Sequence, residues 1–179
     1  MKHFFLSCAC AAAYGIALPA AAHVGLEQGA APAGSSYKAT FKVGHGCGSS
    51  ATRQLVVTIP AGVLGARPMP KAGWTVAIQR APLPKPVISH GRTVTEDVAL
   101  VTWTARSAET ALPSDQYDEF VLRAQLPAEP GPVYWPVSQV CEQGRVEWTQ
   151  VPQPGQKAAD LKSPAAVLDV LPAGHNHQH

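Results

Sequence analysis

Apolar and polar residues alternate along most of the chain that follows residue 22. In segment 37–43 the apolar residues Tyr37, Ala39, Phe41 and Val43 fall on every second position. Successive side chains of a strand point to opposite faces, so this pattern predicts a half-buried strand. Seven further segments rich in Val, Thr or aromatic residues predict strands at 23–28, 54–59, 74–80, 98–104, 120–126, 133–139 and 145–150.

Turn-forming residues separate these segments. Proline, glycine and polar residues gather at 60–62, 82–86, 112–115, 127–132 and 142–144. No strands alternate with long helical patterns, which disfavours a parallel sheet. The chain has 179 residues, enough for one sizeable core. We therefore expect an all-β fold, a single-domain antiparallel β-sandwich.

Composition and the absence of standard motifs exclude several classes of function. Charged residues make up 15% of the chain, the net charge is +2, and no basic stripe is present, so we expect no nucleic-acid partner. The sequence has no glycine-rich phosphate loop, no His-Glu-x-x-His and no Gly-x-Ser-x-Gly motif. Asp118 and Glu119 are adjacent carboxylates, but neighbouring strand residues point to opposite faces, so they do not form a catalytic pair. We expect no enzymatic activity.

The first 22 residues have the pattern of a secretory signal peptide. Lys2 gives a basic start, residues 4–18 are apolar, and small residues precede position 23. The apolar run is short for a helix that spans a bilayer. We expect cleavage after Ala22, a domain over 23–171, a polar tail over 172–179, and a soluble periplasmic protein without a transmembrane anchor.

Loss of this segment removes Cys8 and Cys10 and leaves Cys47 and Cys141. An even pair in an oxidising compartment predicts a disulfide. Closing a loop of about 95 residues would stabilise the fold by about 4–5 kcal/mol. The alternative is a pair of copper thiolates beside His45.

His23 is the strongest candidate for metal chemistry. Cleavage after Ala22 would give it a free α-amine beside its imidazole, and the two nitrogens can close a chelate ring on one ion. Nitrogen-rich tetragonal ligation suits Cu(II). Met69 between two prolines, and His175, His177 and His179 in the tail, are also copper-compatible, although an apolar contact and an incidental polar tail are the ordinary alternatives.

Several ordered blocks of the chain resemble the YcnI-like periplasmic copper-binding domain family. The blocks are AHV at 22–24, AGSSY at 33–37, VGHGC at 43–47, TIPAGV at 58–63, PMPKAGW at 68–74, LP at 112–113, YDEF at 117–120, QVCEQG at 139–144 and VEW at 146–148. The resemblance covers nearly the whole mature chain. It implies an immunoglobulin-like sandwich that binds copper through an N-terminal single-histidine brace, with a late-strand tryptophan beside the ion. The matching positions are His23 and Trp148.

Two further residues complete the expected picture. Trp148 would act as a weak π donor or a lid that excludes water, with core packing as its alternative role. Glu27 shares a strand face with His23, but about 13 Å separates them along an extended strand, so a shared ion requires a bulge or fold-back. Its alternative role is a surface carboxylate that attracts cations. The other tryptophans, Trp74, Trp103 and Trp135, are expected in the core.

We therefore expect an exported protein that holds Cu(II) for copper storage, delivery or homeostasis. Its partner would be a periplasmic copper chaperone or transporter. Two other functions stay open. One is a copper-dependent monooxygenase type of enzyme, whose brace takes a second histidine from the protein. The other is a metal-free adhesion or assembly module in which His23 has no role.

Overall fold

The computed structural model describes residues 23–89 and 91–173. The expected signal peptide, His90 and the three tail histidines lie outside the described residues. Within them the chain forms twelve strands and two single-turn 3-10 helices, η1 (Ala108–Thr110) and η2 (Ala158–Asp160). No helix of this part is long and apolar enough to cross a membrane.

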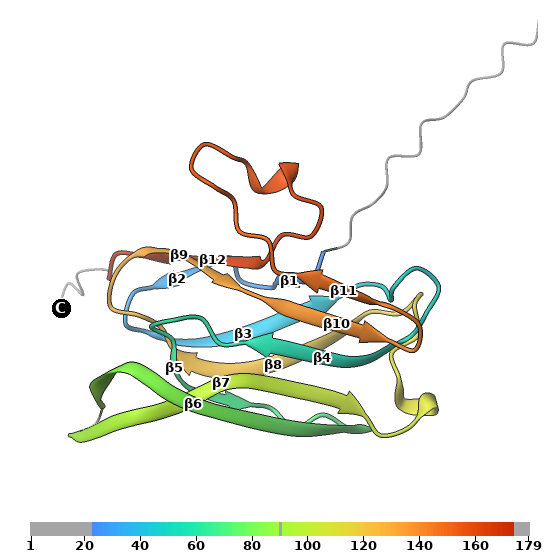
Figure 1. Cartoon of the computed structure of the whole chain (residues 1–179), viewed down its shortest axis with the longest axis horizontal. Coiled ribbons are helices and arrows are strands. Elements are labelled where there is room, and N and C mark those ends of the chain that lie inside the picture. The colour runs from blue at the N-terminus through green and yellow to red at the C-terminus, as the bar shows by residue number, and fades with distance from the viewer. Residues whose placement is uncertain (1–22, 90, 174–179) are drawn as a thin grey trace, which may run out of the picture.

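Two antiparallel sheets form the body of the sandwich (Figure 1). One sheet has the order β1 (Gly25–Leu26), β3 (Ser36–Val43), β8 (Asp118–Gln125), β5 (Leu64–Pro68). The other has the order β11 (Arg145–Trp148), β10 (Val137–Cys141), β4 (Thr52–Thr58), β7 (Arg92–Ala105), β6 (Trp74–Ser89). The expected all-β sandwich is confirmed.

A third, smaller sheet joins the two ends of the described chain. Its order is β2 (Ala30–Pro32), β12 (Ala166–Leu171), β9 (Gly131–Trp135). β12 pairs with β9 antiparallel but with β2 parallel, so the fold is not purely antiparallel. The predicted strand 133–139 is divided at Pro136 between β9 and β10, which belong to different sheets. Proline has no N–H to donate, so it suits a point where the chain changes sheets.

The predicted turn at 82–86 was wrong. β6 runs through this segment and forms a long hairpin with β7 (Figure 1). The prolines only shift the register between Pro82 and Val87. β2, β5 and β12 were not predicted. β12 alternates buried and exposed residues in the structure, but its sequence is apolar except at Asp169, so this alternation is not visible in the sequence.

Aromatic side chains fill the space between the two main sheets. The ring of Phe120 on β8 lies 5.0 Å from that of Trp74 and 5.8 Å from that of Trp103, both from the opposite sheet. Trp103 and Trp135 are fully buried, and Trp74 is nearly so, which confirms all three as core residues. Such edge-to-face packing gives a dense core between the sheets. The loops at the end of the sandwich extend from this core.

Candidate metal centre

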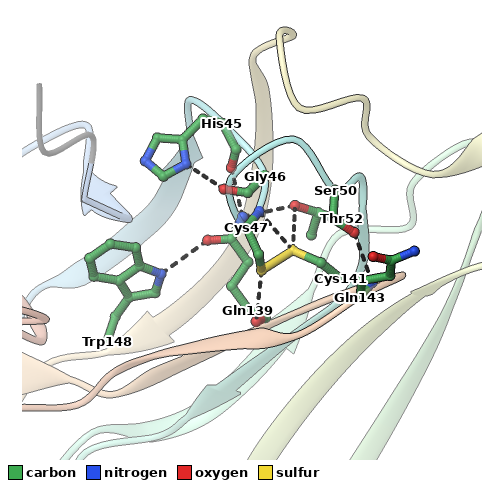
Figure 2. Close-up of a disulfide and its surroundings, with 9 residues drawn as sticks. All are labelled: His45, Gly46, Cys47, Ser50, Thr52, Gln139, Cys141, Gln143 and Trp148. Carbon is green, nitrogen blue, oxygen red and sulfur yellow. Dashed lines mark hydrogen bonds between the residues drawn. A yellow bond between two sulfur atoms is a disulfide. The ribbon is translucent and has the colours of Figure 1, made fainter. Parts of the chain in front are cut away.

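Trp148 is the last residue of β11, an edge strand of the five-stranded sheet. It is 5% exposed, and it pairs across the ladder with Val137 on β10. Its indole Nε1 donates a hydrogen bond of 3.0 Å to Oε1 of Gln139 (Figure 2). Because this N–H is occupied and the strand is paired, the orientation of the ring is set by its surroundings.

His23 lies beside this indole. The two ring centroids are 5.4 Å apart and the planes are inclined by 80°, a T-shaped contact. The next residue, Val24, is buried in the core and anchors the start of the domain, while the His23 side chain is exposed. The structure thus brings together two of the three expected site residues, which come from opposite ends of the domain.

Glu27 lies four residues after His23, directly after β1. Its exposed carboxylate forms an ion pair of 3.0 Å with Lys42, and its backbone N–H donates to the carbonyl of Thr40. The β1–β3 ladder is regular up to this point, without the bulge that a shared ion with His23 requires. In segments 23–89 and 91–173 no three His, Cys, Asp or Glu side chains cluster in a metal-binding arrangement.

His45 is a second histidine beside Trp148. It stands in the loop after β3, half-buried, and its ring centroid lies 6.5 Å from the indole with planes inclined by 70°. Sequence reasoning connected His45 only with a copper–thiolate alternative. One feature of the sequence could have pointed to His45: it lies two residues before Cys47. The disulfide from Cys47 to Cys141 on β10 determines where this loop lies.

Cys47 and Cys141 form a disulfide, as expected, with their Cα atoms 6.0 Å apart. It joins the loop after β3 to the end of β10. Sulfurs bonded to each other are not thiolates, so the thiolate alternative does not describe this pair. Figure 2 shows the His45 and Trp148 rings on the same side of the disulfide.

Gln139 connects these parts of the site. It is 1% exposed, and its Nε2 donates to the His45 carbonyl at 2.7 Å and to the Thr52 hydroxyl at 2.8 Å. Its Oε1 accepts the Trp148 bond, so one amide holds both the indole and the His45 backbone. Sequence reasoning did not select Gln139. The signal was a polar residue at an inward position of an alternating strand.

Gly46 lets this loop close tightly. A side-chain carbon at this position would collide with the backbone carbonyl oxygen of Ser50. Only glycine therefore allows the chain to pass between His45 and Cys47 along this path.

A family model described as "Domain of unknown function (DUF1775)" matches residues 23–170. The chain belongs to the DUF1775 family. YcnI-like proteins are members of this family. A crystal structure of an uncharacterized protein from Nocardia farcinica, described as having an immunoglobulin-like fold, is similar to the chain with a TM-score of 0.64 and 26% identity over 85% of this chain and 99% of that one. No curated protein matches the chain.

This DUF1775 domain has an immunoglobulin-like fold with nitrogen donors at one end. Two imidazoles, from His23 and His45, contact one indole, while the candidate carboxylate Glu27 is paired with Lys42. Imidazole ligands suit copper and zinc, whereas magnesium and calcium prefer oxygen. The residues present fit a copper ion better than a hard cation.

Proposed function

We propose that the mature protein binds one Cu(II) ion at its N-terminus and acts in copper storage, delivery or homeostasis in the periplasm. Cleavage after Ala22 frees the α-amine of His23, and the amine and imidazole together chelate the ion. The observation that supports this proposal is the T-shaped contact of 5.4 Å between the His23 and Trp148 rings. It supports the proposal because the His23 side chain lies beside an indole whose N–H is held by Gln139.

Trp148 forms one side of this site. Its N–H is engaged by Gln139, so the ring, and not the nitrogen, faces His23. The indole excludes water from one side of the ion, and its electron-rich face acts as a weak π donor. This role needs the ring orientation that the hydrogen bond maintains.

Glu27 completes the proposed set as an oxygen donor, and it reaches copper only if the chain before β1 folds back toward it and its ion pair with Lys42 opens. Two variants test this role. If Glu27 is a ligand, Glu27→Gln weakens copper binding and Lys42→Met, which removes the competing cation, strengthens it. If copper affinity is unchanged in both variants, Glu27 is a surface carboxylate outside the site.

The exposed position of His23 would allow copper to be exchanged with another protein. Its side chain is exposed at the edge of the sandwich, so ligands of a second protein can approach the ion without unfolding the domain. A periplasmic copper chaperone or transporter is the partner that this arrangement favours. A buried site would instead favour permanent retention.

The deciding experiment compares two forms of one protein. One begins at His23, and the other carries an added N-terminal Met that turns the amine into an amide. Competition with a chromophoric chelator measures Cu(II) affinity, and paramagnetic resonance reports nitrogen ligation. We expect the extended form to bind at least about tenfold more weakly, a difference of about 1.4 kcal/mol. Equal affinities and identical spectra would refute the brace.

The processed protein also distinguishes the proposed function from the two alternatives. A copper enzyme would consume a reductant and oxygen and release an oxidised product, whereas a carrier would not turn over. A metal-free adhesion or assembly module would show no Cu(II) binding by the processed form at micromolar metal.

A further inference from the structure

Two imidazoles share one indole at the end of this sandwich. The His23 and His45 ring centroids lie 5.4 Å and 6.5 Å from that of Trp148, and both rings stand steeply to its plane. The proposed brace accounts for only the first of them. The brace gives no role to His45, which is half-buried beside the exposed His23.

The strand register brings the two backbones together. Gly25 pairs with Lys42, Leu26 pairs with Phe41, and the N–H of Glu27 bonds to the carbonyl of Thr40. In an antiparallel ladder, each step back along one strand is a step forward along its partner. The last pair of this ladder, Gly25 with Lys42, leaves His23 two residues before it on one strand and His45 three residues after it on the other.

The hydrogen bonding of His45 leaves one ring nitrogen ready for a metal. Nδ1 lies 2.5 Å from the carbonyl oxygen of Gly46, and because a carbonyl only accepts, Nδ1 carries the proton. Nε2 then has a lone pair, and it makes no hydrogen bond to any residue that the structure describes. Metal-binding histidines typically use this arrangement, in which a backbone carbonyl sets the tautomer of the ring.

The His45 loop is also held from three sides. Gln139 donates to the His45 carbonyl at 2.7 Å, the disulfide fixes Cys47, and the close approach to Ser50 leaves no room at Gly46. A ligand on such a loop is oriented before the metal arrives. Gln139 is a positioning residue in this arrangement, because the same amide also orients Trp148.

We propose that Nε2 of His45 is a second imidazole ligand to the Cu(II) ion that His23 chelates. This inference rests on the proposed function and extends it. The ion then has three nitrogen donors, namely the His23 amine, the His23 imidazole and the His45 imidazole, which matches the tetragonal nitrogen ligation that Cu(II) favours. His45 ties the start of the mature chain, through the ion, to a loop that the disulfide holds.

The first test needs no variant. The processed protein, with nitrogen at natural abundance, is loaded with one equivalent of Cu(II) and studied by pulsed paramagnetic resonance, which counts the imidazoles on the ion from their remote nitrogens. We expect two imidazoles at neutral pH. A spectrum with a single imidazole overturns the inference even if the protein binds copper tightly.

Variants then assign the second imidazole. His45→Ala should reduce the spectrum to one imidazole and weaken Cu(II) binding at least about tenfold, a loss of about 1.4 kcal/mol. Added free imidazole should restore the two-imidazole spectrum. The matched control is His90→Ala, which removes a histidine between β6 and β7 and should change neither quantity. Circular dichroism and the thermal midpoint without copper verify that both variants fold.

The outcomes distinguish this inference from the proposed function. If the Met-extended protein binds as tightly as the processed one, the amine brace fails whatever His45 does. If processing matters but His45→Ala keeps wild-type affinity and spectrum, the brace stands and His45 is not a ligand.

Discussion

Gln139→Leu is the sharpest test of how this end of the sandwich is held together. Leucine has a volume similar to that of glutamine but no polar atoms. The substitution removes the acceptor for Trp148 Nε1 and the donors for the Thr52 hydroxyl and the His45 carbonyl. Gln139 itself is 1% exposed, so water has no ready access to replace these bonds.

The expected loss of stability follows from the burial of the partners. Thr52 is 0% exposed and Trp148 is 5% exposed, so both lose a bond that the solvent does not restore. An unsatisfied buried donor or acceptor costs about 1–3 kcal/mol, and two of them cost about 2–6 kcal/mol. For a chain of this size, that loss lowers Tm by about 4–24 °C.

Urea unfolding followed by circular dichroism measures the change in the free energy of unfolding. The control is Gln54→Leu on the adjacent strand β4, where a half-buried glutamine makes one side-chain bond of 2.9 Å to Thr104. We expect the control to cost about 0.5–1.5 kcal/mol, because water can reach its partner. Equal losses at the two positions, with the disulfide intact in both proteins, would refute the role given to Gln139.

Three other changes test separate parts of the structure. Replacing both Cys47 and Cys141 by serine should lower the free energy of unfolding by about 4–5 kcal/mol, and finding two free thiols by mass spectrometry of the non-reduced wild type would contradict the pairing. Burial raises the pKa of Tyr37 to about 12, above the value near 10 expected in the unfolded chain, so the unfolded state ionises first. Stability contributed by this residue is therefore complete below pH 10 and is lost as pH rises to about 12, by roughly 2–3 kcal/mol, and Tyr37→Phe should flatten that part of an unfolding profile measured from pH 9 to 12. Trp148→Phe should alter the absorption and paramagnetic spectra of the copper form more than its affinity, and titration with an unchanged spectrum would remove the indole from the site.

Local patterns in the sequence determined much of the fold. Alternation predicted a strand at 37–43, and the structure has β3 over Ser36–Val43. Parity after removal of the first 22 residues predicted the disulfide, because only one pairing remains for two cysteines. These inferences succeed because strand periodicity and cysteine count are properties of short segments and of composition, and neither requires knowledge of how the sheets stack.

The tertiary structure alone decided which residues share the candidate site. The sequence pointed to His23 and Trp148 through a family resemblance, but nothing near His45 or Gln139 in the chain shows that both meet that indole. The pairing of β10 with β11 brings Gln139 to Trp148, and the pairing of β1 with β3 sets where the start of the domain lies. The disulfide holds the loop that carries His45 beside them. Such contacts join residues far apart in sequence, so they are set by register and sheet packing, which no single segment encodes.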